Sequence, residues 1–244
     1  MKQLWLALVL LTRLPMPHLP AEAFANGARA VWAYPVVGVV VGSFAALCAL
    51  AAAALGLPDV AVSGAAIAGM MMVTGAMHED GLADLFDGFW GAVTTPDRLR
   101  IMRDSQIGTY GVLALVVVTG LRWSALTLLL AEGIGTMIAA AVLSRAVMPL
   151  LMATLPHARD DGLSHSVGRP AMASALVALG IGSVLAIAIL GSAGILAALT
   201  VIAVGAGLGT LARRKIGGQT GDVLGAAQQL AELAVLLLCA AAVA

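Results

Sequence analysis

Four carboxylates are concentrated in nine positions of a chain that is otherwise mostly apolar, within the run HEDGLADLFDG at residues 78–88. If this run is helical, Asp80, Asp84 and Asp87 recur at i, i+4 and i+7 and point to one face. Like charges placed in this way repel one another unless a cation lies between them, and oxygen ligands at this density suit Mg²⁺ or Mn²⁺. The run therefore indicates a divalent-metal site. Glu79, displaced by about 100° around the helix from Asp80, would join or orient that site.

The composition of the chain places this site in a membrane. Of 244 residues, 61% are hydrophobic and 11% are charged, and the mean hydropathy is +1.02, far above that of a soluble domain. The two cysteines, Cys48 and Cys239, lie far apart inside apolar stretches, a pattern that fits neither a disulfide framework nor a zinc site. The expected fold is an all-α polytopic membrane protein, with residues 1–244 as one catalytic domain.

Seven stretches are long and apolar enough to cross a bilayer as helices, which takes about 20 residues each. The connections after the second, fourth and sixth stretches are polar, at residues 78–107, 156–170 and 212–222, whereas the other connections are very short. Counting crossings places these three polar loops and the segment before residue 31 on one side of the membrane. The expected stretches are Val31–Leu57, Val60–Met77, Gly108–Ala131, Gly133–Leu155, Ala171–Leu190, Ala193–Leu211 and Val223–Val243.

The positions of the basic residues indicate which side of the membrane carries these loops. Every Lys and Arg except Arg122 and Arg145 lies in or beside the same-side segments, and the positive-inside rule assigns such segments to the cytoplasm. We therefore expect a site that faces the cytoplasm. The apolar stretch Leu4–Leu14 is too short to span a bilayer and runs into Pro15, which predicts an interfacial or re-entrant N-terminal helix.

Three motifs resemble those of the cobalamin synthase family, the adenosylcobinamide-GDP ribazoletransferases. They read EDGLADxxDG at residues 79–88, RLxIMxDSxIGxxG at 98–111 and GGxTGDxLGA at 217–226. The resemblance covers the full length, because LTRLP at 11–15 and the pair Ser144-Arg145 also look like family features. The acidic motif is specific, since several carboxylates and glycines match in order inside a hydrophobic chain.

This resemblance implies a reaction of late cobalamin biosynthesis. The ribose hydroxyl of α-ribazole 5′-phosphate would attack the phosphorus nearest the corrinoid of adenosylcobinamide-GDP, giving adenosylcobalamin 5′-phosphate and GMP. Such a transfer needs neutralised diphosphate charge and an oriented hydroxyl, which implies Mg²⁺, or Mn²⁺, at the acidic run. The implied partners are the two substrates and the lipid bilayer of a prokaryotic inner membrane, without nucleic acid. A homo-oligomer and a complex with other late corrinoid-assembly enzymes stay open.

The candidate site residues combine these motifs with the placement of charge. The expected metal ligands are Asp80, Asp84, Asp87 and Glu79. The expected catalytic carboxylates are Asp87, as first choice of general base, with Glu79 and Asp104. Other residues are expected to border the substrate, as cations that bind phosphate, as polar groups, or as glycines that let the backbone or a phosphate approach closely. They are Arg98, Arg103, Arg145, Arg159, Thr220, Asp222, Gly81 and Gly88.

Simpler roles compete with several of these assignments. Arg98 and Arg103 would serve equally well as topological anchors of a loop, and Asp222 with Thr220 could cap the last helix. Ionisable groups inside spanning segments need a partner or a cavity. An Arg–Glu pair would therefore explain Glu232 as well as a role in the site would.

Two other function classes fit parts of the pattern. A CDP-alcohol phosphotransferase also uses Asp-rich membrane helices and Mg²⁺, but its motif places Ala-Arg after Asp-Gly, and no Arg follows Gly81 or Gly88 at that spacing. An ion-coupled transporter would carry its carboxylates in mid-membrane crossings. The present cluster is expected at a helix end instead.

Overall fold

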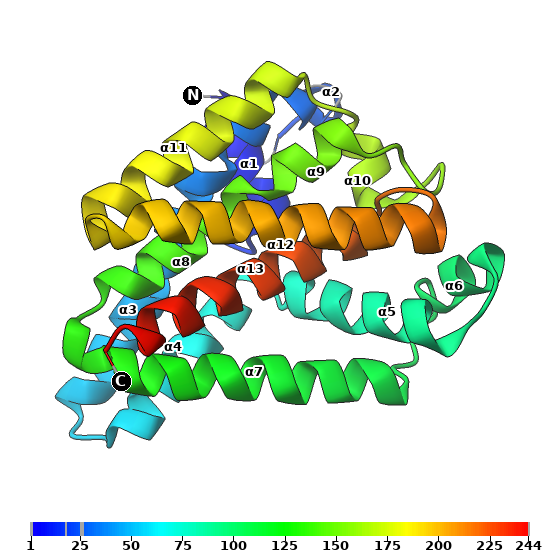
Figure 1. Ribbon diagram of the computed structural model, residues 1–244. Helices are drawn as coiled ribbons and strands as arrows, with labels where there is room; N and C mark the ends of the chain where they lie inside the picture. The colour runs from blue at the N-terminus through cyan, green and yellow to red at the C-terminus, as the bar shows by residue number, and fades with distance from the viewer. Residues whose placement is uncertain (1, 18, 25–26, 244) are drawn as a thin grey trace.

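The chain folds almost entirely into helices in the computed structural model, which describes residues 2–17, 19–24 and 27–243 (Figure 1). Within these residues the only β-type contact is an isolated bridge between His157 and Gln219, so the expected all-α class is confirmed. The α-helices are α1 (Lys2–Leu11), α2 (Ala21–Phe24), α3 (Tyr34–Ala54), α4 (Asp59–Thr74), α5 (Met77–Gly91), α6 (Thr95–Ile101), α7 (Thr109–Leu129), α8 (Gly135–Ala146), α9 (Met148–Thr154), α10 (Gly162–Val167), α11 (Met172–Leu190), α12 (Ala193–Ile216) and α13 (Gly221–Ala241). The short 3₁₀ helices are η1 (Gly27–Arg29), η2 (Val31–Ala33) and η3 (Leu130–Glu132).

Six helical segments are long and apolar enough to cross a membrane. They correspond to six of the seven expected stretches, with ends displaced by a few residues. The largest displacement is in α12, which runs to Ile216 instead of ending at Leu211. The segments are Val31–Ala54, Thr109–Glu132, Gly135–Thr154, Met172–Leu190, Ala193–Ile216 and Gly221–Ala241.

The remaining expected stretch, Val60–Met77, corresponds to α4, which ends three residues earlier and forms a bent pair with α5. The helix α4 ends at Thr74, α5 begins at Met77, and the two are bent by 89°. Gly75 ends α4 in the left-handed conformation with φ of 67°, which glycine adopts without steric cost. Ala76 follows with φ of 55°. The bend gives the acidic run a helix of its own, which agrees with the helical spacing expected for its carboxylates.

The interior of the bundle is formed by α8 and α13. In their most apolar windows, 89% of Gly135–Thr154 and 72% of α13 are buried, compared with 22% of α11. The helix α13 packs against α5, α7, α8 and α12. Gln229 and Glu232 of α13 are 2% and 1% exposed, so this face of the last helix lies in the interior.

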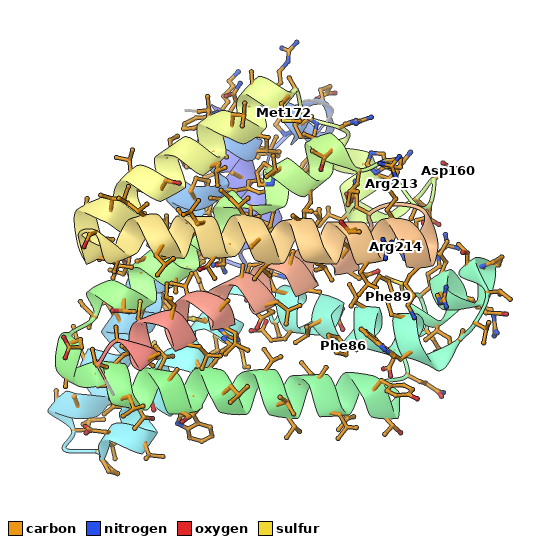
Figure 2. The ribbon with its side chains drawn as sticks, viewed as in Figure 1. Phe86, Phe89, Asp160, Met172, Arg213 and Arg214 are labelled. Atoms are coloured by element: carbon orange, nitrogen blue, oxygen red, sulfur yellow. The ribbon has the colours of Figure 1, made fainter. Side chains whose placement is uncertain are left out.

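The three polar connections meet at one end of the bundle, on the right in Figure 1. Arg98 donates a hydrogen bond to the carbonyl of Lys215 at the end of α12 (2.9 Å). Arg103 forms an ion pair with Asp161 in the second connection (2.8 Å), and backbone hydrogen bonds join that connection to the third. This confirms that the three loops share one side, which we call the charged end. Figure 2 labels Asp160, Arg213 and Arg214 there.

The helix α1 is the expected short N-terminal helix, although it ends at Leu11 and not at Leu14. Its ten residues span about 15 Å, which is too short to cross a bilayer. It packs against α3, and four of its side chains, Leu6, Ala7, Leu10 and Leu11, are buried. The helix α1 therefore covers part of the bundle, next to the cavity described below.

The helices α5 and α13 cross in close backbone contact at Gly81. A Cβ added there would lie 3.0 Å from the Cα of Asp222 and 3.1 Å from its carbonyl oxygen. We expect Gly81→Ala to lower the free energy of unfolding by about 1–3 kcal/mol through overpacking. Gly120→Ala in α7, which meets open space, should be neutral or stabilising by up to about 1 kcal/mol. Melting temperatures in detergent measure both effects, and equal values for the two variants would contradict the close crossing.

Candidate active site

The four carboxylates of α5 differ in their exposure and in the groups that surround them. Asp80 is exposed and Asp84 is half-buried, whereas Asp87 and Glu79 are both 6% exposed. Asp84 lies close enough to Asp80, Asp87 and Asp222 for their charges to act on it. We call Asp80 and Asp84 of α5, together with Asp222 of α13, the acidic cluster. Glu79 and Asp87, near the two ends of the α5 motif, contact other parts of the protein.

Asp87 caps the N-terminus of α7. Its Oδ2 accepts a hydrogen bond from the amide of Gly108 (2.7 Å), and its Oδ1 accepts one from the amide of Gly111 (2.9 Å). Amides in the first turn of a helix have no partner within the helix, and the helix dipole favours a carboxylate there. A Cβ at Gly108 would lie 2.5 Å from Oδ1. The backbone thus engages both oxygens of the residue expected as metal ligand and general base.

We expect Asp87→Ala to lower the free energy of unfolding by about 0.5–2 kcal/mol, because two amides lose their cap. Asp87→Asn, which keeps one acceptor oxygen, should lose less. Thermal melts and turnover, measured on the same preparations, check both variants. A variant with wild-type stability and a turnover lower by about 100-fold or more would instead assign Asp87 to proton transfer.

Glu79 points into a buried charge network between α5, α7, α8 and α13. Its Oε1 accepts hydrogen bonds from Gln229 (3.0 Å) and Arg122 (3.3 Å), and Arg122 also donates to Glu232. Arg145 lies 3.7 Å from Glu232 as a second ion pair. The network contains two acids and two arginines and so carries no net charge. Its other members are Gln228 and Ser144.

This network supplies the partners that the ionisable residues of the spanning helices require. Arg122, Arg145 and Glu232 are each 2% exposed or less, and each is paired, as buried charges in a membrane protein must be. The Arg–Glu pair, one of the two interpretations of Glu232, is present. The structure therefore places Arg145, an expected phosphate ligand, against Glu232 in the interior.

A cavity of about 150 Å³ opens beside the acidic cluster. Asp80, Asp222 and Arg159 line one part of it, where α5, α13 and the second polar loop come together. Apolar side chains from α1, α5, α9, α10 and α13 form the rest, together with His78 and Tyr34. The cavity thus joins a charged region to an apolar one.

Arg159 is the cation nearest the acidic cluster. Its side chain is 13% exposed, with NH2 3.5 Å from Oδ2 of Asp222 and Nε 3.3 Å from Oδ1 of Asp161. Neither its Nε nor its NH1 makes a hydrogen bond within the described part of the chain. Thr220 caps α13 by accepting from the amide of Val223 (3.3 Å), and it also donates to Asp222 (3.1 Å). Asp222 is thus oriented by a cap and faces the cavity.

The other expected site residues contact protein groups away from this cavity. Arg98 holds α6 against α12, and a Cβ on Gly88 would collide with Met102. Asp104 accepts from the amide of Gln106 (3.1 Å) at an exposed turn, and the ion pair of Arg103 is about half exposed. Such exposed pairs contribute about 0–1 kcal/mol. Their expected roles in metal or phosphate binding stay predictions.

The second polar loop is held by neutral contacts as well as charged ones. His157 contacts Gln219 through Nδ1 (3.0 Å), and Gln219 accepts a hydrogen bond from Ser164 of α10 (2.6 Å). Partial burial lowers the pKa of His157, and the nearby His165 and Arg169 lower it further. These surroundings favour the neutral form of the imidazole. The loop that carries Arg159 is fixed against the turn before α13.

The cavity is lined by two carboxylates, the kind of ligand that magnesium uses. Among the described residues, no three His, Cys, Asp or Glu side chains converge on one point. Mg²⁺ keeps several of its waters, however, and is commonly bound through one or two carboxylates together with substrate phosphates. Asp80 and Asp222, from two helices and facing one cavity, supply such a pair.

The family model described as cobalamin-5-phosphate synthase matches residues 3–240, which is nearly the whole chain. The chain belongs to the cobalamin-5-phosphate synthase family. It is therefore a transferase, and the three motifs quoted above all lie within the matched region. This membership excludes the CDP-alcohol phosphotransferase and the ion-coupled transporter as its class.

Curated relatives of this cobalamin-5-phosphate synthase family member align along most of their length, and three of them are named adenosylcobinamide-GDP ribazoletransferase. The one from Bradyrhizobium diazoefficiens is 43% identical over 233 residues, covering 94% of this chain and 90% of the relative. The one from Mesorhizobium japonicum is 39% identical over 240 residues (97% and 92%). The one from Azorhizobium caulinodans is 43% identical over 243 residues (95% and 92%). No solved structure matches the chain.

Sequence reasoning missed the cavity wall that this family member builds from distant segments. Leu10 and Leu11 of α1, Tyr34 of α3 and Ser164 of α10 all line the cavity. Nothing in their local sequence indicates this. His78 directly precedes the acidic motif, so its position in the sequence pointed to the site. Its burial of 99% could not be read from the sequence.

Proposed function

We propose that this membrane transferase joins adenosylcobinamide-GDP to α-ribazole 5′-phosphate, forming adenosylcobalamin 5′-phosphate and GMP. The observation that carries the proposal is the near full-length match to relatives named adenosylcobinamide-GDP ribazoletransferase. The acidic cluster beside a cavity supports it, because phosphoryl-type transfer depends on positioning and on charge stabilisation.

In this reaction one phosphorus–oxygen bond replaces another. The ribose hydroxyl oxygen of α-ribazole 5′-phosphate bonds to the phosphorus nearest the corrinoid, and the bond from that phosphorus to the bridging oxygen of the diphosphate breaks. GMP leaves with the electron pair of the broken bond. The hydroxyl proton passes to a carboxylate of the enzyme.

The residues at the cavity divide these tasks. Arg159, with two guanidinium nitrogens free of hydrogen bonds, would bind the diphosphate. Asp80 and Asp222 would hold Mg²⁺, which when bound supplies positive charge to the diphosphate and the leaving GMP. Asp84, which is half-buried near these two carboxylates but does not line the cavity, would accept the hydroxyl proton. This assignment replaces Asp87 with Asp84 as the base, because both oxygens of Asp87 are engaged by α7.

The site would face the cytoplasm of a prokaryotic inner membrane. The support is that the cavity lies at the charged end, where the three polar connections meet and where Arg213 and Arg214 lie (Figure 2). Cationic loops of this kind remain on the cytoplasmic side. Both substrates would then reach the cavity from the cytoplasm.

The test is product formation by the full chain in liposomes. Purified protein receives adenosylcobinamide-GDP and α-ribazole 5′-phosphate, with Mg²⁺ or with EDTA, and GMP and the corrinoid product are measured by mass spectrometry. We expect equal amounts of both products with Mg²⁺ and neither with EDTA. Absence of product in a folded preparation with Mg²⁺ would overturn the proposed reaction, and undiminished product in EDTA would overturn the metal requirement.

A further inference from the structure

The cavity beside the acidic cluster has an apolar part that the roles above leave unused. It is built from five different helices, and its polar rim at Asp80, Asp222 and Arg159 borders only one part of it. Three methionine side chains contribute to the wall, and methionine adapts to aromatic rings through its polarisable sulfur. The apolar lining residues are Leu10, Leu11, Met77, Met148, Met152, Leu163, Val167 and Leu224.

A histidine without partners lies in this wall. His78 is 1% exposed, and among the described residues neither its Nδ1 nor its Nε2 has a hydrogen-bond partner. A buried polar group without a partner costs about 1–3 kcal/mol, so such groups in native proteins call for an explanation. Tyr34 lines the same cavity. Each ring nitrogen of His78 exposes less than 1 Å² of surface, so a ligand with a polar ring atom would satisfy His78 once the imidazole turns toward the cavity.

The size of the cavity limits which part of the two substrates can enter it. Its volume is about 150 Å³, the size at which an apolar cavity in another protein holds benzene. A corrin macrocycle carrying a nucleotide is far too large to enter. A small planar aromatic base is of the right size and shape.

We propose that this cavity is the subsite for the aromatic base of the ribazole substrate, and that His78 donates a hydrogen bond to a ring nitrogen of that base. The proposal rests on the proposed function and deepens it. The apolar wall would contact both faces of the ring, and one imidazole N–H would pair with the nitrogen lone pair. The attached ribose would then extend toward Asp80 and Asp222, where its hydroxyl meets the acidic cluster.

The competing occupant is a lipid acyl chain, since the protein lies in a bilayer. An acyl chain would fill the apolar wall and leave both nitrogens of His78 without a partner. The end of the acyl chain would also lie beside Asp80, Arg159 and Asp222, where methylene groups make no favourable contact with the charged side chains. The combination of apolar wall, buried histidine and charged rim matches a base joined to a sugar phosphate.

Equilibrium binding of radiolabelled α-ribazole to the detergent-purified chain, without any corrinoid, tests the subsite. We expect His78→Phe, which keeps an aromatic ring and removes the donor, to weaken binding by about tenfold or more. His165→Phe is the matched control, because His165 is exposed and does not line the cavity, and it should bind like the wild type. Equal affinities for His78→Phe and the wild type would overturn the role of His78.

A second variant keeps the test valid if His78→Phe fails to fold. Leu163 is 49% exposed and lines the cavity from α10, so Leu163→Trp can enlarge the wall without overpacking the core. We expect it to weaken α-ribazole binding by about tenfold and to leave inhibition by ribose 5-phosphate, which lacks the base, unchanged. Unchanged α-ribazole binding would overturn the subsite.

Turnover separates this proposal from the proposed function. With active protein, His78→Phe should raise KM for α-ribazole 5′-phosphate and leave KM for adenosylcobinamide-GDP within about twofold of the wild type. Product formation with equal KM increases for both substrates would overturn the subsite and leave the reaction standing. A wild type that binds α-ribazole at the cavity but forms no product would overturn the reaction and leave the subsite standing.

Discussion

Replacement of Asp222 by Asn should lower turnover by about 100-fold or more while the protein stays folded. Asp222 faces the cavity, lies 3.5 Å from Arg159 and accepts a hydrogen bond from Thr220. Asn retains the size of the side chain and an acceptor oxygen for Thr220, so the change removes mainly the charge. Loss of one preorganised charge at a phosphoryl-type centre typically costs about 10²–10³ in rate. The measurement is the rate of GMP release beside a thermal melt.

Asp97 offers the matched control for that charge removal. Its side chain on α6 is 48% exposed, and the hydrogen bond from Thr94, with the nearby Arg100, lowers the pKa of its carboxyl. Asp97→Asn should therefore leave turnover within about twofold of the wild type, as expected for a surface position. If Asp222→Asn lowered the melting temperature and left turnover unchanged, Asp222 would be only a partner of the Thr220 cap.

The second large effect concerns the buried charge network. Glu232→Gln should lower the free energy of unfolding by about 3–5 kcal/mol, because removal of one partner leaves a buried charge uncompensated. Glu232 is 1% exposed and pairs with both Arg122 and Arg145. Gln has nearly the same shape, so the loss would reflect charge and not volume. Thermal or denaturant unfolding in one detergent measures it.

The double variant Arg122→Met/Glu232→Leu separates charge balance from packing. It removes one positive and one negative group and leaves Glu79 with Arg145, so the interior stays neutral. Replacing a whole buried pair by apolar side chains of similar volume is often neutral. We therefore expect the double variant to be more stable than Glu232→Gln. A single variant as stable as the wild type would show that the network does not hold the helices together.

The sequence predicted the bundle well where hydropathy and structure coincide. Long apolar runs must become helices in a bilayer, and the polar connections at residues 78–107, 156–170 and 212–222 mark one end. The bend at Gly75 and Ala76 could not be predicted in this way, because the apolar composition continues to Met77 across it. Hydropathy records what a residue prefers as its surroundings and not the direction of the backbone.

The site was predictable only in part, for a similar reason. Helical spacing places Asp80, Asp84 and Asp87 on one face, but it does not show what lies opposite each turn. The N-terminus of α7 opposes Asp87, and Arg122 with Gln229 opposes Glu79. Asp222 lies 138 to 142 positions beyond Asp84 and Asp80 in the chain. Its place beside them depends on the crossing of α5 and α13 at Gly81, a tertiary contact.

The most direct test of the account is metal binding by the carboxylates of two helices at one cavity. Titration with Mn²⁺, followed by electron paramagnetic resonance and competed with Mg²⁺, reports binding without turnover. We expect the wild type and the surface control Asp59→Asn/Asp97→Asn, whose residues do not line the cavity, to bind Mn²⁺ equally, and Asp80→Asn/Asp222→Asn to lose that binding while folded. Equal Mn²⁺ binding by all three proteins would contradict the site at α5 and α13.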